Sequence, residues 1–77
     1  MTLENLKPVI EATLPNCDAA AVTLEARLIP EVCQDSLDTV ELSMALEENF
    51  GVNVPDDLMA TFGTVADLIA YMSEHGV

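Results

Sequence analysis

Residues 35–51 read DSLDTVELSMALEENFG, and this stretch decides the fold. Asp35 or Ser36 can cap the N-terminus of a helix, because short polar side chains accept hydrogen bonds from N–H groups of the first turn. Asp38 adds a negative charge to that turn, which the helix dipole favours. Gly51 can end the helix, since glycine readily takes the left-handed conformation of a C-terminal cap. We therefore expect a helix from Asp35 to Phe50.

This helix has two apolar stripes, given about 100° between successive residues. The stripe expected to pack on a core consists of Leu42, Leu46 and Phe50. The second stripe, Leu37, Val40 and Met44, lies on roughly the opposite side and is bordered by Glu41, Glu47 and Glu48. A second stripe means either a binding surface or burial on both sides. The pattern leaves both open: a docking face with an acidic rim, or a stripe covered by the preceding loop.

Upstream, residues 2–14 carry apolar side chains at helical spacing, and a long connection follows. An interior proline costs about 3 kcal/mol, whereas the first turn tolerates one. The helix should therefore begin near Asn5 or bend at Pro8, and end at Pro15-Asn16. Asp18 can cap a short turn over residues 19–22, and Pro30 excludes one helix running on to Ser36. We expect residues 16–34 to form a long loop with four apolar anchors, namely Leu24, Leu28, Ile29 and Val32.

Downstream, residues 52–55 should be extended, because the residue before Pro55 avoids the helical region. Asp56 begins a short helical turn that Gly63 breaks, and Thr64 can cap a last helix through Met72. The chain is thus predicted to be all-α, a small bundle of three main helices and one short helix with a long first loop.

Length and charge limit the class of protein. A chain of 77 residues makes one domain, which we expect to span residues 1–77. Only three residues are aromatic, so the core should consist of Leu, Val, Ile, Met and Ala. Fourteen acidic residues face only Lys7 and Arg27, and the net charge of −12 repels nucleic acids and anionic membranes while it attracts proteins with basic patches. No apolar run approaches the roughly 20 residues that span a bilayer, so we expect no membrane insertion.

Few residues support catalysis or metal binding. Cys17 and Cys33 have neither metal-ligand spacing nor the pattern of a disulfide framework, although one disulfide between them stays open. His75 is the only histidine, and no serine or cysteine has an evident base partner. We expect a non-catalytic protein without a metal site. No signal peptide is visible, which favours a reduced, cytoplasmic location.

Ser36 stands where a loop meets the start of a helix, a position that can expose its hydroxyl beside a helix N-terminus that favours phosphate. In isolation, the simpler interpretation is an N-cap. However, the run Asp35-Ser36-Leu37-Asp38-Thr39-Val40-Glu41-Leu42, continued by Met44-Ala45-Leu46-Glu47-Glu48, resembles the signature of the acyl carrier protein family. The resemblance continues more loosely through Val54-Pro55-Asp56 and Thr64-Val65. It matches the first third of the chain only in helix placement and length.

The resemblance implies a 4′-phosphopantetheine arm, transferred from coenzyme A to Ser36 by a phosphopantetheinyl transferase. The arm would carry acyl groups as thioesters to enzymes of fatty acid, lipid or polyketide synthesis. The family fold is a four-helix bundle whose interior can shelter the acyl chain, and we expect a monomer. Partner docking is implied for Asp35, Leu37, Asp38, Val40, Glu41, Met44, Glu47 and Glu48. Because these residues include the second apolar stripe, the resemblance favours docking for that stripe.

The chain departs from the family pattern before Ser36. The family usually has glycine two residues before the aspartate, where this chain has Cys33, so the loop is expected to differ in shape. A partly buried, inert thiol is the favoured interpretation of Cys33. With the prolines of the first half, this departure favours a specialised carrier over a housekeeping one. Two alternatives remain: an unmodified acidic adaptor domain in which Ser36 is only a cap, and an aminoacyl or peptidyl carrier.

Overall fold

The computed structural model describes residues 1–15 and 17–77, and its longest helix, α2, spans Ser36–Phe50. The side chain of Asp35 is the N-cap and accepts a hydrogen bond from the N–H of Asp38. Gly51 ends the helix in the left-handed conformation, with φ +72°, and its N–H donates to the carbonyl of Glu47. The predicted helix is confirmed, and Asp35 rather than Ser36 is its cap.

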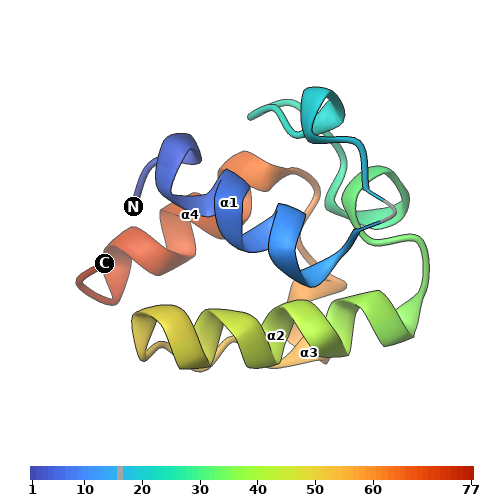
Figure 1. Cartoon of the computed structure of the whole chain (residues 1–77). Coiled ribbons are helices and arrows are strands. Elements are labelled where there is room, and N and C mark those ends of the chain that lie inside the picture. The colour runs from blue at the N-terminus through green and yellow to red at the C-terminus, as the bar shows by residue number, and fades with distance from the viewer. Residues whose placement is uncertain (16) are drawn as a thin grey trace.

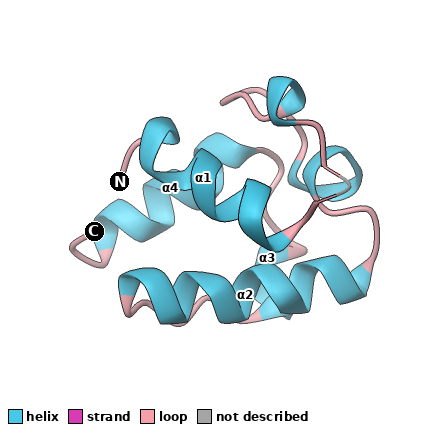
Figure 2. Ribbon diagram, in the orientation of Figure 1, coloured by secondary structure: helices cyan, strands magenta, loops and turns pink. Residues whose placement is uncertain are grey.

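Three further α-helices complete the bundle, α1 (Leu3–Thr13), α3 (Asp56–Met59) and α4 (Val65–Glu74). Both α1 and α3 contact α2. Figure 1 shows both chain termini at the left, whereas α2 begins at the right, next to the loop that leads from α1. In the described residues only one isolated bridge, between Arg27 and Thr64, has β character, and Figure 2 shows helices joined by loops. The all-α prediction, with three main helices and one short one, is confirmed.

Helix α1 begins earlier than its sequence indicates. Thr2 is the N-cap, and its side chain accepts a hydrogen bond from the N–H of Asn5. The carbonyl of Thr2 also accepts from the N–H of Leu6, at 3.1 Å. The expected start near Asn5 is therefore wrong, because a local capping interaction extends the helix to Leu3. The helix continues through Pro8, which is exposed, to Thr13.

The long loop contains two short helical turns. The predicted turn is a 3₁₀ helix, Ala19–Ala21, and the carboxylate of Asp18 accepts a hydrogen bond from the N–H of Ala20 at 3.0 Å. The second, Leu28–Val32, is a π-type turn that the sequence did not predict. In it the N–H groups of Val32 and Cys33 donate to carbonyls five residues earlier.

Two of the four predicted loop anchors are wrong. Leu28 and Val32 are buried, but Leu24 and Ile29 are exposed. The segment is attached through its backbone, since the carbonyl of Leu24 accepts a hydrogen bond from the N–H of Ala66 at the start of α4. Ile29 has an extended conformation inside the π-type turn, with φ −127° and ψ 126°. The inward contacts of the loop come instead from smaller residues, including Val22 and Ala26.

The core is aliphatic, as the composition predicts. The buried apolar residues, from the four helices and the connections between them, are Leu6, Ile10, Leu14, Val22, Ala26, Leu28, Val32, Cys33, Leu42, Leu46, Val52, Val54, Met59, Val65, Leu68 and Met72. Phe50, Phe62 and Tyr71 only pack against the edge of this cluster. Helix α4 is held at its start by a capping box, in which Thr64 and Asp67 each accept a hydrogen bond from the backbone of the other.

Candidate functional site

The start of α2 is fixed by three hydrogen bonds that do not involve Ser36. Asp35 Oδ1 accepts from the N–H of Asp38 at 3.1 Å, and Asp38 Oδ2 accepts from the N–H of Gln34 at 2.9 Å. The buried hydroxyl of Thr39 donates to the carbonyl of Asp35 at 3.0 Å. Ser36 is the first residue of the helix and is exposed. Its side chain is therefore available at a helix N-terminus, and the interpretation of Ser36 as the N-cap is wrong.

The backbone at Cys33, in the loop before Ser36, is unstrained. Its φ of −100° lies in the extended region, so this position does not require glycine here. Its side chain is fully buried, not partly buried as expected. Burial, followed by the negative charge of Asp38, raises the pKa of the Cys33 thiol to about 12. Cys33 is thus a protonated core residue at neutral pH, and both Cys17 and Cys33 are free thiols.

The second apolar stripe of α2 is exposed. Leu37, Val40 and Met44 have exposed fractions of 63%, 38% and 58%. Each neighbouring glutamate, Glu41, Glu47 and Glu48, is exposed as well. The loop therefore does not cover this stripe, which contradicts the alternative of burial on both sides. A shallow hollow of about 420 Å³ lies over its C-terminal part, lined by Met44, Glu47 and Glu48.

The two aspartates implicated in docking differ in position. Asp35 is exposed, whereas Asp38 is half-buried because its carboxylate turns toward the backbone of Gln34. Seven of the eight residues for which the resemblance implies docking are thus exposed, and the eighth, Asp38, also braces the preceding loop.

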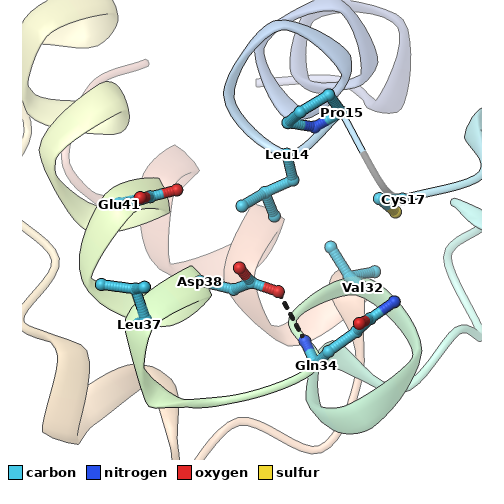
Figure 3. Close-up of a pocket in the computed structure, with 8 residues that line it drawn as sticks. All are labelled: Leu14, Pro15, Cys17, Val32, Gln34, Leu37, Asp38 and Glu41. Atoms are coloured by element: carbon cyan, nitrogen blue, oxygen red, sulfur yellow. Dashed lines mark hydrogen bonds between the residues drawn. The ribbon is translucent and has the colours of Figure 1, made fainter.

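A second hollow adjoins this surface, between the end of α1, the long loop and the start of α2 (Figure 3). Its volume is about 250 Å³, and its lining residues are Leu14, Pro15, Cys17, Val32, Gln34, Leu37, Asp38 and Glu41. We call it the α1–α2 cleft. Figure 3 shows Leu14, Asp38 and Val32 arranged around a common space. The sequence did not predict this cleft, because its residues come from three separate segments.

The sole histidine of the chain, His75, lies at the end of α4. The ring of His75 stacks on Tyr71 at 4.2 Å between centroids, and its Nδ1 lies 2.9 Å from the carbonyl oxygen of Tyr71. In the described residues, the ring of His75 therefore interacts with Tyr71 on the same helix. No group of three or more His, Cys, Asp or Glu is placed to hold a metal ion in this part of the chain. Among the helices that the structure describes, none is long and apolar enough to cross a membrane.

Comparison with known proteins agrees with this geometry. Residues 10–72 match the family model described as "Phosphopantetheine attachment site". The acyl carrier protein of Helicobacter acinonychis (strain Sheeba) is 44% identical over 72 residues, which cover 94% of this chain and 91% of that protein. The acyl carrier protein of Rickettsia typhi (strain ATCC VR-144 / Wilmington) is 46% identical over 59 residues, or 77% of this chain and 69% of that protein. The chain belongs to the acyl carrier protein family, whose members share the phosphopantetheine attachment domain.

Proposed function

We propose that this protein carries acyl groups on a 4′-phosphopantetheine arm esterified to Ser36, and presents them to biosynthetic enzymes without catalysing a reaction itself. The observation that carries the proposal is the exposed hydroxyl of Ser36 at the start of α2, inside the matched residues 10–72. The arm supplies a terminal thiol that holds acyl groups as thioesters. The protein supplies the attachment point and the surface that partners recognise.

The residues around Ser36 suit a phosphate ester. Because Asp35 caps the helix, esterification of Ser36 breaks no hydrogen bond among those found in the described residues. The unpaired N–H groups of the first turn and the helix dipole favour a negative charge at this end. The carboxylates of Asp35 and Asp38 oppose it, but the latter is turned toward Gln34. A phosphate can therefore be held on the solvent side of the turn.

The exposed stripe of α2 suits partners that bind briefly. Leu37, Val40 and Met44 offer an apolar centre, and Met adapts to differently shaped pockets. The glutamates beside them, with a net charge of −12 on the chain, steer basic surfaces toward this face. Partners would be a phosphopantetheinyl transferase and enzymes that act on acyl chains. We also propose a cytoplasmic location, which is supported by the two free thiols.

The proposal is tested by modification in vitro. The purified protein is incubated with coenzyme A, Mg²⁺ and a broad-specificity phosphopantetheinyl transferase, and its intact mass is recorded beside that of Ser36→Ala. We expect a gain of one phosphopantetheine in the wild type only. Ser36→Ala should keep the far-ultraviolet circular dichroism of the wild type, because Ser36 does not cap α2. A folded wild type that gains no mass with several transferases would favour the unmodified adaptor.

Acyl and aminoacyl cargo are separated by a second measurement. The modified protein is offered to an acyl-activating enzyme and to an amino-acid-activating enzyme, and thioester formation is followed by mass. Loading with the fatty acyl group alone supports the acyl carrier. Loading with the amino acid alone would favour the aminoacyl carrier.

A further inference from the structure

The sulfur atoms of the chain, in four methionines and two cysteines, differ widely in exposure. The side chain of Met44 is 58% exposed, whereas Met59 and Met72 are fully buried. Met1 is half-buried and packs against the core. We propose that Met44 is a redox modification site, at which a hydroperoxide forms a sulfoxide that weakens docking on α2 until a reductase removes it. This inference rests on the proposed function, because it assigns a regulation to the docking face.

The oxidation of a thioether by a hydroperoxide is a balanced two-electron step. A lone pair of the Met44 sulfur attacks the distal oxygen of the hydroperoxide, so a sulfur–oxygen bond forms and the oxygen–oxygen bond breaks. The hydroperoxide proton moves to the leaving oxygen, which departs as water or an alcohol. Sulfur is thus oxidised and the peroxide is reduced. A methionine sulfoxide reductase reverses the change with electrons from thiols.

The two cysteines react poorly with the same oxidant. A thiol reacts as the thiolate, whereas a thioether needs no deprotonation. Burial, followed by the negative charge of Asp38, raises the pKa of the Cys33 thiol to about 12. Burial, followed by the charges of Asp18 and Asp38, also raises the pKa of the Cys17 thiol. Both thiols are therefore protonated at neutral pH, and exposure directs the oxidant to Met44.

A sulfoxide changes the side chain that a partner would bury at this face. Met44 lines the shallow hollow on α2 together with Glu47 and Glu48. Unoxidised methionine is flexible and apolar, so it adapts to apolar pockets of different shapes. The oxygen of a sulfoxide accepts hydrogen bonds from water, and these bonds are lost when an apolar pocket covers it, which is costly. The two glutamates cannot replace them, because a carboxylate only accepts hydrogen bonds. Oxidation of Met44 should therefore weaken docking.

Met44 is separate from both the modified hydroxyl and the core. It follows Ser36 by eight positions in α2, which corresponds to a rise of about 12 Å along the helix axis. Its side chain is mostly exposed, so a sulfoxide displaces no core contact. The sulfoxide should therefore leave the reacting hydroxyl and the fold unchanged, and act on partner binding.

Peptide mapping by mass spectrometry gives the first test. The protein without an arm is treated with a limiting amount of hydrogen peroxide at neutral pH, so that no arm thiol competes for the oxidant. Dithiothreitol then reduces any disulfide but leaves sulfoxides in place. We expect Met44 to be oxidised about tenfold faster than Met59 and Met72, which react only when the fold opens locally. Equal oxidation of the buried methionines would overturn the proposal.

The rate of phosphopantetheine transfer at subsaturating concentrations gives the second test, and each protein is compared with its own untreated state. In the wild type we expect oxidation to lower the rate about tenfold, the loss expected when an apolar side chain that a partner buries becomes polar. Met44→Leu removes the thioether but keeps an apolar side chain. The matched control, Met44→Leu with Ala70→Met, moves the exposed methionine to an exposed site on α4. Oxidation should slow neither variant, and because Met1 is present in all three proteins, an effect of its oxidation would appear in each of them.

The outcomes separate this inference from the proposed function. An unchanged rate in the oxidised wild type, an equal loss in Met44→Leu, or a lower urea midpoint after oxidation would overturn the regulation and leave the carrier function standing. Treatment with a methionine sulfoxide reductase should restore the rate, and a loss that persists after the sulfoxide has gone would also overturn it. An untreated wild type that gains no arm would overturn the proposed function, and this inference with it.

Discussion

The hydrogen bond from the N–H of Asp38 to the carboxylate of Asp35, 3.1 Å long, holds the first turn of α2. Removing an N-cap acceptor costs about 0.5–2 kcal/mol and typically about 1 kcal/mol. In a domain of this size, about 1 kcal/mol corresponds to a fall in Tm of about 4–8 °C. Asp35→Ala also removes one negative charge from a chain of net charge −12, and this relief of repulsion acts in the opposite direction. The stability change measured for Asp35→Ala therefore combines two effects of opposite sign.

Asp35→Asn separates these effects, because asparagine caps a helix about as well as aspartate but carries no charge. We expect Asp35→Asn to match or slightly exceed the wild type in stability, and Asp35→Ala to lie about 1 kcal/mol below Asp35→Asn. Equilibrium urea denaturation followed by circular dichroism measures both. If the two variants lose the same stability, the carboxylate contributes through its charge and the capping argument is wrong. The rate of phosphopantetheine transfer to the two variants then shows what the charge of Asp35 adds to docking.

Substitutions at four other positions test the fold and the docking surface. Gly51→Ala should lower the free energy of unfolding by about 1–2 kcal/mol, because φ at this position is +72°. No atom lies within 4 Å of the added Cβ, so the backbone conformation alone sets this cost, and Gly51→Asn should lose less. The folded-state pKa of Cys33, about 12, exceeds the ordinary thiol pKa of 9.0, so the stability gained from its neutral form is complete below about pH 9 and is lost as the pH rises toward 12. Urea midpoints at several pH values should show this slope, and Cys33→Ala should lack it. Met44→Ala should keep the free energy of unfolding within about 0.5 kcal/mol of the wild type, since the Met44 side chain is mostly exposed. The same substitution should nevertheless slow phosphopantetheine transfer. Glu48→Gln should reduce the association rate mainly at low salt, and a salt-independent effect would contradict steering.

The parts of the fold that the sequence predicts are those governed by local interactions. Asp35 and Gly51 define α2 through capping that involves only neighbouring residues. Thr64 and Asp67 do the same for α4. The sequence fails in the long loop, where burial depends on distant partners. Leu24 is exposed, and its segment is held by a hydrogen bond from the N–H of Ala66 to the carbonyl of Leu24, which no local pattern indicates.

In the candidate site, too, the sequence predicts what local patterns determine and fails where distant residues meet. Helical periodicity was sufficient to place Leu37, Val40 and Met44 on one surface of α2, although only the structure shows that the loop leaves them exposed. The α1–α2 cleft could not be predicted, because its lining residues come from the end of α1, the long loop and α2, which only the fold brings together. The extended conformation of Cys33 was also beyond the sequence, since the expected glycine suggested a different loop shape.

The hydrogen bonds at the start of α2 allow Ser36 to be modified without loss of fold stability. A serine that capped its own helix would lose a hydrogen bond when esterified, and the carrier with an arm would then be less stable than the carrier without one. Here Asp35 supplies the cap, Asp38 braces the loop and Thr39 closes the turn, so the fold does not depend on the hydroxyl of Ser36. The same two carboxylates add to the acidic surface that we propose partners recognise. The carboxylates of Asp35 and Asp38 therefore have a structural function in these hydrogen bonds, beside the recognition function that we propose for their charge. Neutral and charged variants of Asp35 are the substitutions that distinguish the two functions.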